Sequence, residues 1–188
     1  MSQTIVTQNA EYKMLLGEHI RTIPDYPKPG VLFRDVTTLI LDPIAFHRTV
    51  LELAEPYEGD EIDKVVGIEA RGFIFGAAVA YQLNAGFVPA RKAGNLPSAV
   101  FQQHYELEYG SNTLEIHKDA IKPDDKIIVI DDLLATGGSA CAAIDLIFGA
   151  GGSVVSCGFV VELSDLTGRQ RIENKAIAVH TLCQFKDT

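Results

Sequence analysis

Residues 127–138 read IIVIDDLLATGG, and this stretch constrains the fold more than any other part of the chain. Its four successive β-branched residues predict a strand buried on both faces, as in a parallel sheet. Two adjacent carboxylates, Asp131 and Asp132, stand at the C-terminal end of that strand. A loop with two glycines follows, and the apolar segment after Ser139 is typical of a helix. This order predicts an open α/β sheet with a ligand site at the carboxyl end of the strand.

The same loop predicts an anion site. Backbone N–H groups of a glycine loop and of a helix N-terminus form a cradle for phosphate. Gly137 and Gly138 would let the backbone approach the anion, and Thr136 and Ser139 would add hydroxyl donors. The two acidic residues before the loop would repel a phosphate. We therefore expect them to accept hydrogen bonds from a sugar diol or to hold a hard cation such as Mg²⁺. A ligand with both features is a ribose 5-phosphate.

Other phosphate-binding patterns do not fit this sequence. No lysine followed by Ser or Thr closes a six-residue glycine loop, and no Gly-x-Gly-x-x-Gly follows a strand. An ordinary strand-to-helix turn would explain a lone Asp-Asp or Gly-Gly pair. It does not explain a strand, an acid pair, a threonine, a diglycine and a helix start in succession.

At these residues the chain resembles the phosphoribosyl pyrophosphate signature of the type I phosphoribosyltransferase family. Three further segments narrow the resemblance to members that act on adenine: residues 25–35 (DYPKPGVLFRD), 67–76 (GIEARGFIFG) and 105–110 (YELEYG). The fold that this implies is α/β, a doubly wound, mostly parallel sheet flanked by helices, with a small N-terminal hood. We expect a single domain over residues 1–188, with the hood at about 1–35 and the core at about 36–188.

Composition excludes several classes of protein. A chain of 188 residues that is 47% hydrophobic can form one α/β domain with a full core. A net charge of −9 leaves no basic face for general nucleic-acid binding. The N-terminus has no apolar signal core, and no run reaches the ~20 residues of a membrane span. Cys141, Cys157 and Cys183 lack metal-site spacing, so reduced thiols and a cytoplasmic location are expected.

The periodicity of the remaining chain predicts alternating strands and helices. We expect helices over residues 10–21, from Pro43 toward Pro56 and over 72–83, and strands at 65–68, 86–90, 113–117, 153–161 and 176–182. The proline-rich segment between residues 24 and 30 is interpreted as a stiff connector. Residues 113–117 alternate as an exposed strand would. Residues 93–110 show little periodicity, which is typical of a functional or disordered loop.

A second strand-to-helix turn lies at residues 69–72. Arg71 could present a planar cation to a phosphate, and Gly72 permits close backbone approach. From the turn alone, a local pairing of Arg71 with Glu69 is an equal alternative. The resemblance implies that Glu69, Ala70, Arg71 and Gly72 form the pyrophosphate loop, whose first peptide bond is often cis in the family.

Arg91 and Lys92 end the next predicted strand, again at the ligand edge of the sheet. On its own, such a basic pair is typical of a solvated surface. The resemblance implies that both contact pyrophosphate and its loop. One position departs from the family, which usually has lysine where this chain has Asn95. Asn95 removes a positive charge from the loop, so the resemblance does not assign a pyrophosphate contact to this position.

The resemblance also assigns a base site. A lone aromatic residue such as Phe33 is most often part of a core. In the family, however, Phe33 would stack on one face of the purine and Leu133 would cover the other. Backbone groups near Leu32 and Arg34 would read the purine edge, and so distinguish the amine of adenine from a carbonyl.

Tyr105, Glu108 and Tyr109 end the irregular segment. Their sequence alone favours an exposed acidic loop with amphipathic tyrosines. The resemblance implies a mobile catalytic loop in which Glu108 exchanges a proton with the purine N7.

The reaction that the resemblance implies is adenine plus 5-phosphoribosyl 1-pyrophosphate giving AMP plus pyrophosphate, a purine-salvage step. Glu108, Arg71 and Lys92 would be catalytic. Mg²⁺ would be bound mainly through the substrate, with Asp131 and Asp132 as further candidate ligands, and the protein would be a homodimer. One alternative is a phosphoribosyltransferase for xanthine or hypoxanthine. Another is a phosphoribosyl-pyrophosphate-sensing regulator with a DNA-binding module, which the acidic charge and the short segment before the hood motif disfavour.

Overall fold

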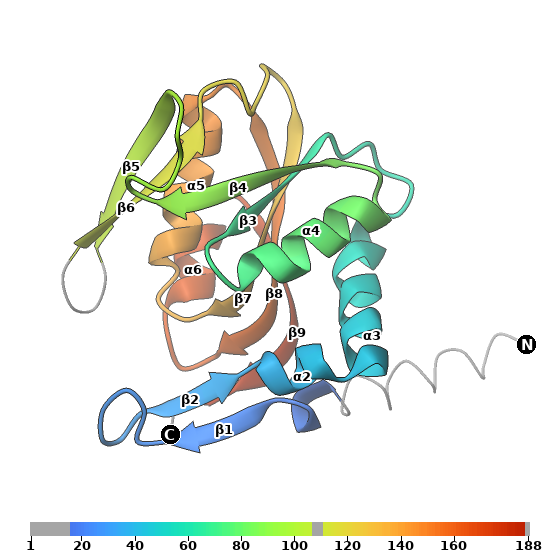
Figure 1. Cartoon of the computed structure of the whole chain (residues 1–188), viewed down its shortest axis with the longest axis vertical. Helices are drawn as coiled ribbons and strands as arrows, with labels where there is room; N and C mark the ends of the chain where they lie inside the picture. Colours follow the sequence, from blue (N-terminus) through green and yellow to red (C-terminus); the bar gives the residue numbers. More distant parts are fainter. Residues whose placement is uncertain (1–15, 107–110, 187–188) are drawn as a thin grey trace, which may run out of the picture.

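The computed structural model describes residues 16–106 and 111–186. In chain order its elements are β1 (Arg21–Pro24), β2 (Leu32–Asp35), α2 (Thr37–Leu41), α3 (Pro43–Ala54), the 3-10 turn η1 (Glu55–Tyr57), β3 (Lys64–Ile68), α4 (Gly72–Gln82), β4 (Gly86–Lys92), β5 (Val100–Glu106), β6 (Ser111–His117), β7 (Lys126–Leu134), α5 (Gly138–Gly149), β8 (Ser153–Leu163), α6 (Gly168–Glu173) and β9 (Ala178–Phe185). Figure 1 shows a central sheet with helices on both faces and a two-stranded ribbon at one end.

The main sheet has seven strands in the order β5-β6-β4-β3-β7-β8-β9. Strands β4, β3, β7, β8 and β9 are parallel, while β6 pairs antiparallel with both β4 and β5. The chain proceeds from β3 outward to β4 and later returns to β7 on the other side of β3. The strand order therefore reverses between β3 and β7, where doubly wound sheets bind ligands. The predicted fold class is confirmed.

Strand β7 is the centre of the core because both of its faces are covered. Ile127 and Val129 belong to the hydrophobic cluster that includes α5, whereas Ile128 and Ile130 belong to the cluster that includes α3 and α4. All four side chains are fully buried. Successive residues of a strand point to opposite faces, so an unbroken β-branched run is what a strand between two helical layers requires.

The N-terminal ribbon, β1 with β2, is an antiparallel pair separate from the main sheet. Asp35 ties it to the core because its carboxylate accepts hydrogen bonds from the Arg21 side chain and from the backbone N–H of Thr37. The predicted proline-rich connector is thus a hairpin whose strands flank the prolines of the turn. Of the predicted helix over residues 10–21, residues 16–18 are helical, and the prediction is wrong from residue 19 onward, since the chain turns there and Arg21 begins β1. Residues 10–15 lie outside the described residues.

Two predictions for the β5–β6 hairpin were wrong. Residues 100–106, expected to be irregular, form β5, which pairs with β6 from Val100↔His117 to Glu106↔Ser111. Strand β6 is not exposed, since Leu114 and Ile116 are buried. Helix α5 packs against both strands and covers this face.

The other predicted elements are confirmed with shifted ends: most strands are longer than expected, and β9, expected from residue 176, begins at Ala178. Helix α3 begins with Pro43 in its first turn, and the Asp42 side chain caps it by accepting the N–H groups of Ile44 and Ala45. Strand β4 continues to Lys92, and β7 continues to Leu134, so the acid pair lies within the last part of β7 rather than after it. In the described part of the chain, no helix is long and apolar enough to cross a membrane.

Candidate active site

The reversal point between β3 and β7 carries a cavity of about 390 Å³. Its lining residues are Ile68, Glu69, Ala70, Arg71, Lys92, Tyr105, Leu114, Asp131, Asp132, Leu133 and Ser139. The fold thus brings together candidate residues from the ends of β3, β4, β5 and β7. They meet because the carboxyl ends of parallel strands share one edge of the sheet.

The acid pair, Asp131 and Asp132, lines this cavity, and the two carboxylates have different environments. Asp131 is buried, and its Oδ1 accepts the backbone N–H of Asp132 at 2.9 Å. Burial, together with the neighbouring Asp132 carboxylate, raises the pKa of Asp131 well above its usual range. The Asp132 carboxylate accepts a hydrogen bond from Nε of Arg71. One acid is therefore held by the backbone, and the other by a cation from the neighbouring turn.

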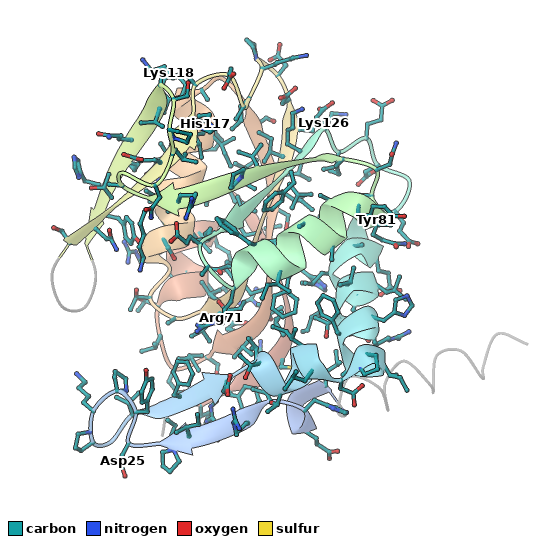
Figure 2. All side chains as sticks on the ribbon, viewed as in Figure 1. Asp25, Arg71, Tyr81, His117, Lys118 and Lys126 are labelled. Atoms are coloured by element: carbon teal, nitrogen blue, oxygen red, sulfur yellow. The ribbon has the colours of Figure 1, made fainter. Side chains whose placement is uncertain are left out.

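Arg71 connects the core with the N-terminal ribbon. It precedes α4, on the side of the core that faces β2 (Figure 2), and its guanidinium carbon lies 5.5 Å from the centre of the Phe33 ring. Cations favour the face of an aromatic ring at such distances. The alternative in which Arg71 pairs with Glu69 is not observed, because Arg71 pairs with Asp132 and Glu69 with Arg91.

Glu69 fixes the end of β4. Its Oε2 accepts hydrogen bonds from Nε of Arg91 at 3.1 Å, from the N–H of Lys92 at 3.1 Å and from the Asn95 amide at 3.5 Å. Burial alone would raise the pKa of Glu69, but these hydrogen bonds outweigh it and lower the pKa. Arg91 also donates to the Asn95 carbonyl, so of the basic pair only Lys92 lines the cavity. The peptide bond between Glu69 and Ala70 is cis.

The glycine loop, residues 135–139, borders a second cavity of about 170 Å³. Leu133 and Ser139 line both cavities, so the two cavities lie next to each other. Gly137 has φ +74° and precedes α5; this left-handed conformation favours glycine. The loop contains no charged side chain. Its polar groups are the backbone and the hydroxyls of Thr136 and Ser139, as a neutral phosphate cradle requires.

The candidate base-site residues of the ribbon lie beside the cavity rather than in its lining. The Phe33 ring contacts Arg71, which lines the cavity. It also packs edge-on against the Tyr26 ring, with 5.1 Å between the ring centres. Arg34 lies 4.5 Å from the centre of the Phe185 ring and donates to the Lys186 carbonyl at 2.9 Å. Leu32 pairs with Pro24 in the ribbon. These contacts place the ribbon against the C-terminal strand.

Of the candidate catalytic segment, Glu108 and Tyr109 lie outside the described residues. Tyr105 lines the cavity of about 390 Å³ that contains the acid pair. It also lines a neighbouring cavity of about 490 Å³ between β5 and α5. Burial and the negative charge of Asp131 raise the pKa of the Tyr105 hydroxyl. Tyr105 thus stands between the two spaces.

Sequence reasoning missed two residues that shape the site. Glu115 is buried, and its carboxylate accepts the N–H of Gly94 at 3.0 Å and the amide of Gln102 at 2.6 Å, which fixes the loop after β4. A carboxylate between Leu114 and Ile116 in an alternating strand was the signal that could have revealed it. Arg171 donates to the Thr136 carbonyl from α6, and no local pattern links residues so distant in sequence.

Comparisons with known proteins agree with this geometry. Residues 40–185 match the family model described as phosphoribosyl transferase domain. An adenine phosphoribosyltransferase from Ruegeria pomeroyi is 54% identical over 168 residues, which cover 89% of this chain and 94% of that protein.

Solved structures give the same result. The adenine phosphoribosyltransferase from Rhodothermus marinus is 46% identical with a TM-score of 0.89, and the match covers 94% of this chain and 99% of that chain. The enzyme from Saccharomyces cerevisiae, solved with an imino-altritol bisphosphate and adenine, is 40% identical with a TM-score of 0.86, covering 92% and 99%. The chain described here therefore belongs to the phosphoribosyltransferase family and, within it, to the adenine phosphoribosyltransferases.

Proposed function

We propose that this protein transfers the 5-phosphoribosyl group from 5-phosphoribosyl 1-pyrophosphate to N9 of adenine, giving AMP and pyrophosphate, as a step of purine salvage. The observation that carries the proposal is the pair of neighbouring cavities at the β3–β7 reversal point. One has cations and carboxylates in its lining, and the other is bordered by a neutral glycine loop. A sugar with a phosphate at one end and a pyrophosphate at the other fits this division.

The neutral loop is the proposed site of the 5-phosphate. Ala135, Gly137 and Gly138 would present backbone N–H groups, with hydroxyls from Thr136 and Ser139. Immediately before the loop, the acid pair of β7 would accept hydrogen bonds from the two ribose hydroxyls. The proposed ribose would lie where the two cavities meet, beside Leu133 and Ser139.

The cationic part of the cavity of about 390 Å³ is the proposed pyrophosphate site. Arg71 and Lys92 line it, together with Glu69 and Ala70, and Gly72 begins α4 beside them. Arg91 would act indirectly by holding Glu69. As the bond from C1 of the ribose to pyrophosphate breaks, negative charge grows on the leaving group, and placed cations stabilise that charge. Arg71 pairs with Asp132 in this structure, so binding of pyrophosphate would compete with that ion pair.

The base would lie between Phe33 and Leu133, where Arg71 now approaches the Phe33 ring. Backbone groups of Leu32 and Arg34 would read its edge. Displacement at C1 passes through an oxocarbenium-like state, as in other glycosyl transfers. The purine must lose its N–H proton as N9 attacks, and Glu108, flanked by Tyr105 and Tyr109, is the proposed group that exchanges a proton at N7.

Mg²⁺ is the proposed cofactor. Within residues 16–106 and 111–186, no cluster of three or more His, Cys, Asp or Glu side chains could hold a metal ion by itself. Asp131 and Asp132 supply carboxylate oxygens, the ligand type that Mg²⁺ prefers, and the donor set fits an ion whose other ligands are substrate oxygens and water. When bound, the ion would neutralise charge on the pyrophosphate.

We further propose a cytoplasmic homodimer. Leu41, Ile44 and Tyr81 are large side chains that remain mostly exposed on α2, α3 and α4. Exposed apolar side chains of this size are candidates for a subunit interface. All three cysteines are buried and none of them forms a disulfide, as expected in a reducing compartment.

The direct test is a reaction of adenine with 5-phosphoribosyl 1-pyrophosphate, run with and without Mg²⁺. Chromatography measures the AMP that forms. Hypoxanthine and xanthine serve as matched acceptors. Of the three purines, we expect only adenine to give a nucleotide product. A chelator that removes Mg²⁺ should abolish turnover. Rapid turnover of hypoxanthine or xanthine would contradict the proposed base, and binding of the substrate without turnover of any purine would favour a sensor.

The proposed role of Glu108 has its own test. Glu108→Gln keeps the shape of the side chain but cannot take the proton. Proton transfer by a placed side chain contributes about 10²–10⁴-fold, so kcat should fall within that range while the KM for phosphoribosyl pyrophosphate changes little. Tyr109→Phe is a neighbouring control without loss of a carboxylate. A kcat within about threefold of the parent would remove Glu108 from the mechanism.

A further inference from the structure

Helix α6 lies directly against the glycine loop, backbone to backbone. A Cβ atom placed on Gly168 would lie 2.3 Å from the Ala135 carbonyl oxygen, and one placed on Gly137 would lie 2.9 Å from the Gly168 carbonyl oxygen. Separations this short leave no room for a side chain between the two segments. The position of the loop therefore depends on the position of α6.

Helix α6 is in turn anchored to the sheet by Arg169. Its guanidinium donates to both carboxylate oxygens of Glu162 on β8, at 2.8 and 2.6 Å, and to the Val179 carbonyl and the Thr181 hydroxyl on β9. Glu162 is buried, and its hydrogen bonds from the Arg169 side chain lower its pKa. A bidentate arginine–carboxylate pair of this kind fixes orientation as well as distance. The start of α6 is thus a rigid support.

Arg171 extends from the same helix to the loop. Its Nη1 donates to the carbonyl oxygen of Thr136 at 2.9 Å. In the described chain, the cis peptide bonds are Tyr26–Pro27 and Glu69–Ala70, so the Thr136–Gly137 peptide is trans. The carbonyl and N–H of a trans peptide point in opposite directions. A carbonyl held toward Arg171 therefore directs the Gly137 N–H away from it.

The orientation of the Thr136–Gly137 peptide matters because Gly137 allows this peptide to adopt a second orientation. Glycine populates positive and negative φ almost equally, so the peptide before it can rotate at little cost. After such a rotation, the Thr136 carbonyl oxygen would replace an N–H donor beside the anion, and its partial negative charge would repel phosphate. A hydrogen bond from a cationic donor on α6 opposes the rotation.

We infer that Arg171 is a positioning residue for the 5-phosphate loop: it holds the Thr136 carbonyl outward and thereby keeps the Gly137 N–H available to the phosphate. The inference rests on the proposed function only in the identity of the ligand. The contact that Arg171 makes is with the loop, so we expect it to contribute to binding of the phosphate rather than to the bond-breaking step.

The test uses the variants Arg171→Met, Arg171→Lys and, as a matched control, Lys175→Met. Lys175 also lies near the end of α6 and pairs with Asp145, so its removal deletes a nearby positive charge without touching the loop. Calorimetry measures the Kd of ribose 5-phosphate, and steady-state kinetics measures kcat and the KM for each substrate. Hydrogen bonds that involve a charged group set the scale, and the exposure of Arg171 places its effect at the low end.

We expect Arg171→Met to raise the Kd of ribose 5-phosphate and the KM for phosphoribosyl pyrophosphate about tenfold, with the KM for adenine within about twofold. Arg171→Lys, which can still donate to the carbonyl, should recover at least half of the loss on a logarithmic scale. Lys175→Met should stay within about twofold of the parent. If Arg171→Met does not fold, Arg171→Ala takes its place: the KM for phosphoribosyl pyrophosphate should rise and the KM for adenine should change little.

Several results would overturn the inference. These are an unchanged Kd for ribose 5-phosphate, an equal rise in KM for both substrates, an equal effect of Lys175→Met, or failure of the parent protein to bind ribose 5-phosphate. The calorimetric arm requires no turnover. A protein that makes no AMP but loses ribose 5-phosphate affinity on Arg171→Met would refute the proposed function and support the inference.

Discussion

The two turns that face each other across the β3–β7 reversal point have the same backbone role but different chemistry. Both connect a parallel strand to a helix. Residues 69–72 carry two charged side chains, and each forms an ion pair with another segment, Glu69 with Arg91 and Arg71 with Asp132. Residues 135–139 carry none, and their donors are backbone N–H groups and hydroxyls.

The difference follows from what each turn would hold in the proposed reaction. The 5-phosphate keeps the same charge throughout, so a rigid neutral cradle that binds substrate and transition state equally is sufficient, and such binding appears in KM. The pyrophosphate gains charge as it leaves. Cations that act there stabilise the transition state more than the ground state, which appears in kcat. Variants of the glycine loop should therefore change mainly KM, whereas variants of the charged turn should change mainly kcat.

Among variants of the two turns, the largest expected effect is at Arg71. Arg71→Met should lower kcat by about 10²–10³-fold, the loss observed when one placed donor to a developing anion is removed. Affinity for AMP, which contains no pyrophosphate, should change much less. Steady-state kinetics and calorimetry with AMP provide the two measurements.

The control for Arg71 addresses its second contact. Removing the guanidinium leaves Asp132 without its cation, so the melting temperature is measured alongside, and Arg71→Lys restores a charge at that place. Partial recovery of kcat by lysine would support the leaving-group role. Equal losses in kcat and AMP affinity would show that the two turns are not divided as proposed.

The next effect, expected to be smaller, is at the hydroxyls of the glycine loop. Thr136→Val and Ser139→Ala each remove one hydrogen bond to a charged phosphate, which is worth roughly 1.5–3 kcal/mol, or about 10–100-fold in affinity. The KM for phosphoribosyl pyrophosphate and the Kd of AMP should rise together, while kcat stays within about threefold. Initial-rate kinetics over both substrates measures this. A fall in kcat with unchanged KM would contradict a uniform cradle.

The contrast between the two turns also explains which parts of the site could be predicted from the sequence. The β7 strand and its loop form one contiguous stretch in which each residue type has a local reason, so their pattern was readable. Arg71 was found, but its partner was not. The choice between Glu69 and Asp132 depends on how two strands lie beside each other, which no local pattern records.

The missed elements have similar causes. Strand β5 faces the core with Phe101 and Tyr105, but Gln103 lies between them on the same face and interrupts the apolar alternation that identifies strands. Its pairing with β6 settles its structure. The support of the loop by Arg171 is a contact across 35 positions, formed because α6 is anchored elsewhere by Arg169. Tertiary packing, rather than propensity, decides both.

The smallest expected effect concerns acid sensitivity, in which the charged turn should differ from the neutral one. Hydrogen bonds from Lys92 N–H and Arg91 lower the pKa of Glu69 below its usual value of 4.5, against the opposing effect of burial. A carboxylate whose pKa is lowered by folding stabilises the folded state at pH values above its unfolded pKa, and this contribution is lost as the pH falls through the folded value. Because the pair is partly exposed, it contributes at most about 1 kcal/mol.

Glu69→Gln should therefore lower the free energy of unfolding by up to about 1 kcal/mol at pH 7 and at pH 5.5, and the difference from the parent should close as the pH falls below 4.5. Urea unfolding at several pH values measures it. Ser139→Ala is the matched variant in the neutral turn, and its difference from the parent should stay constant over the same range, since residues 135–139 contain no carboxylate. An offset for Glu69→Gln that is independent of pH would mean that Glu69 acts through shape and neutral hydrogen bonds. The charged turn would then be held together in the same way as the neutral one.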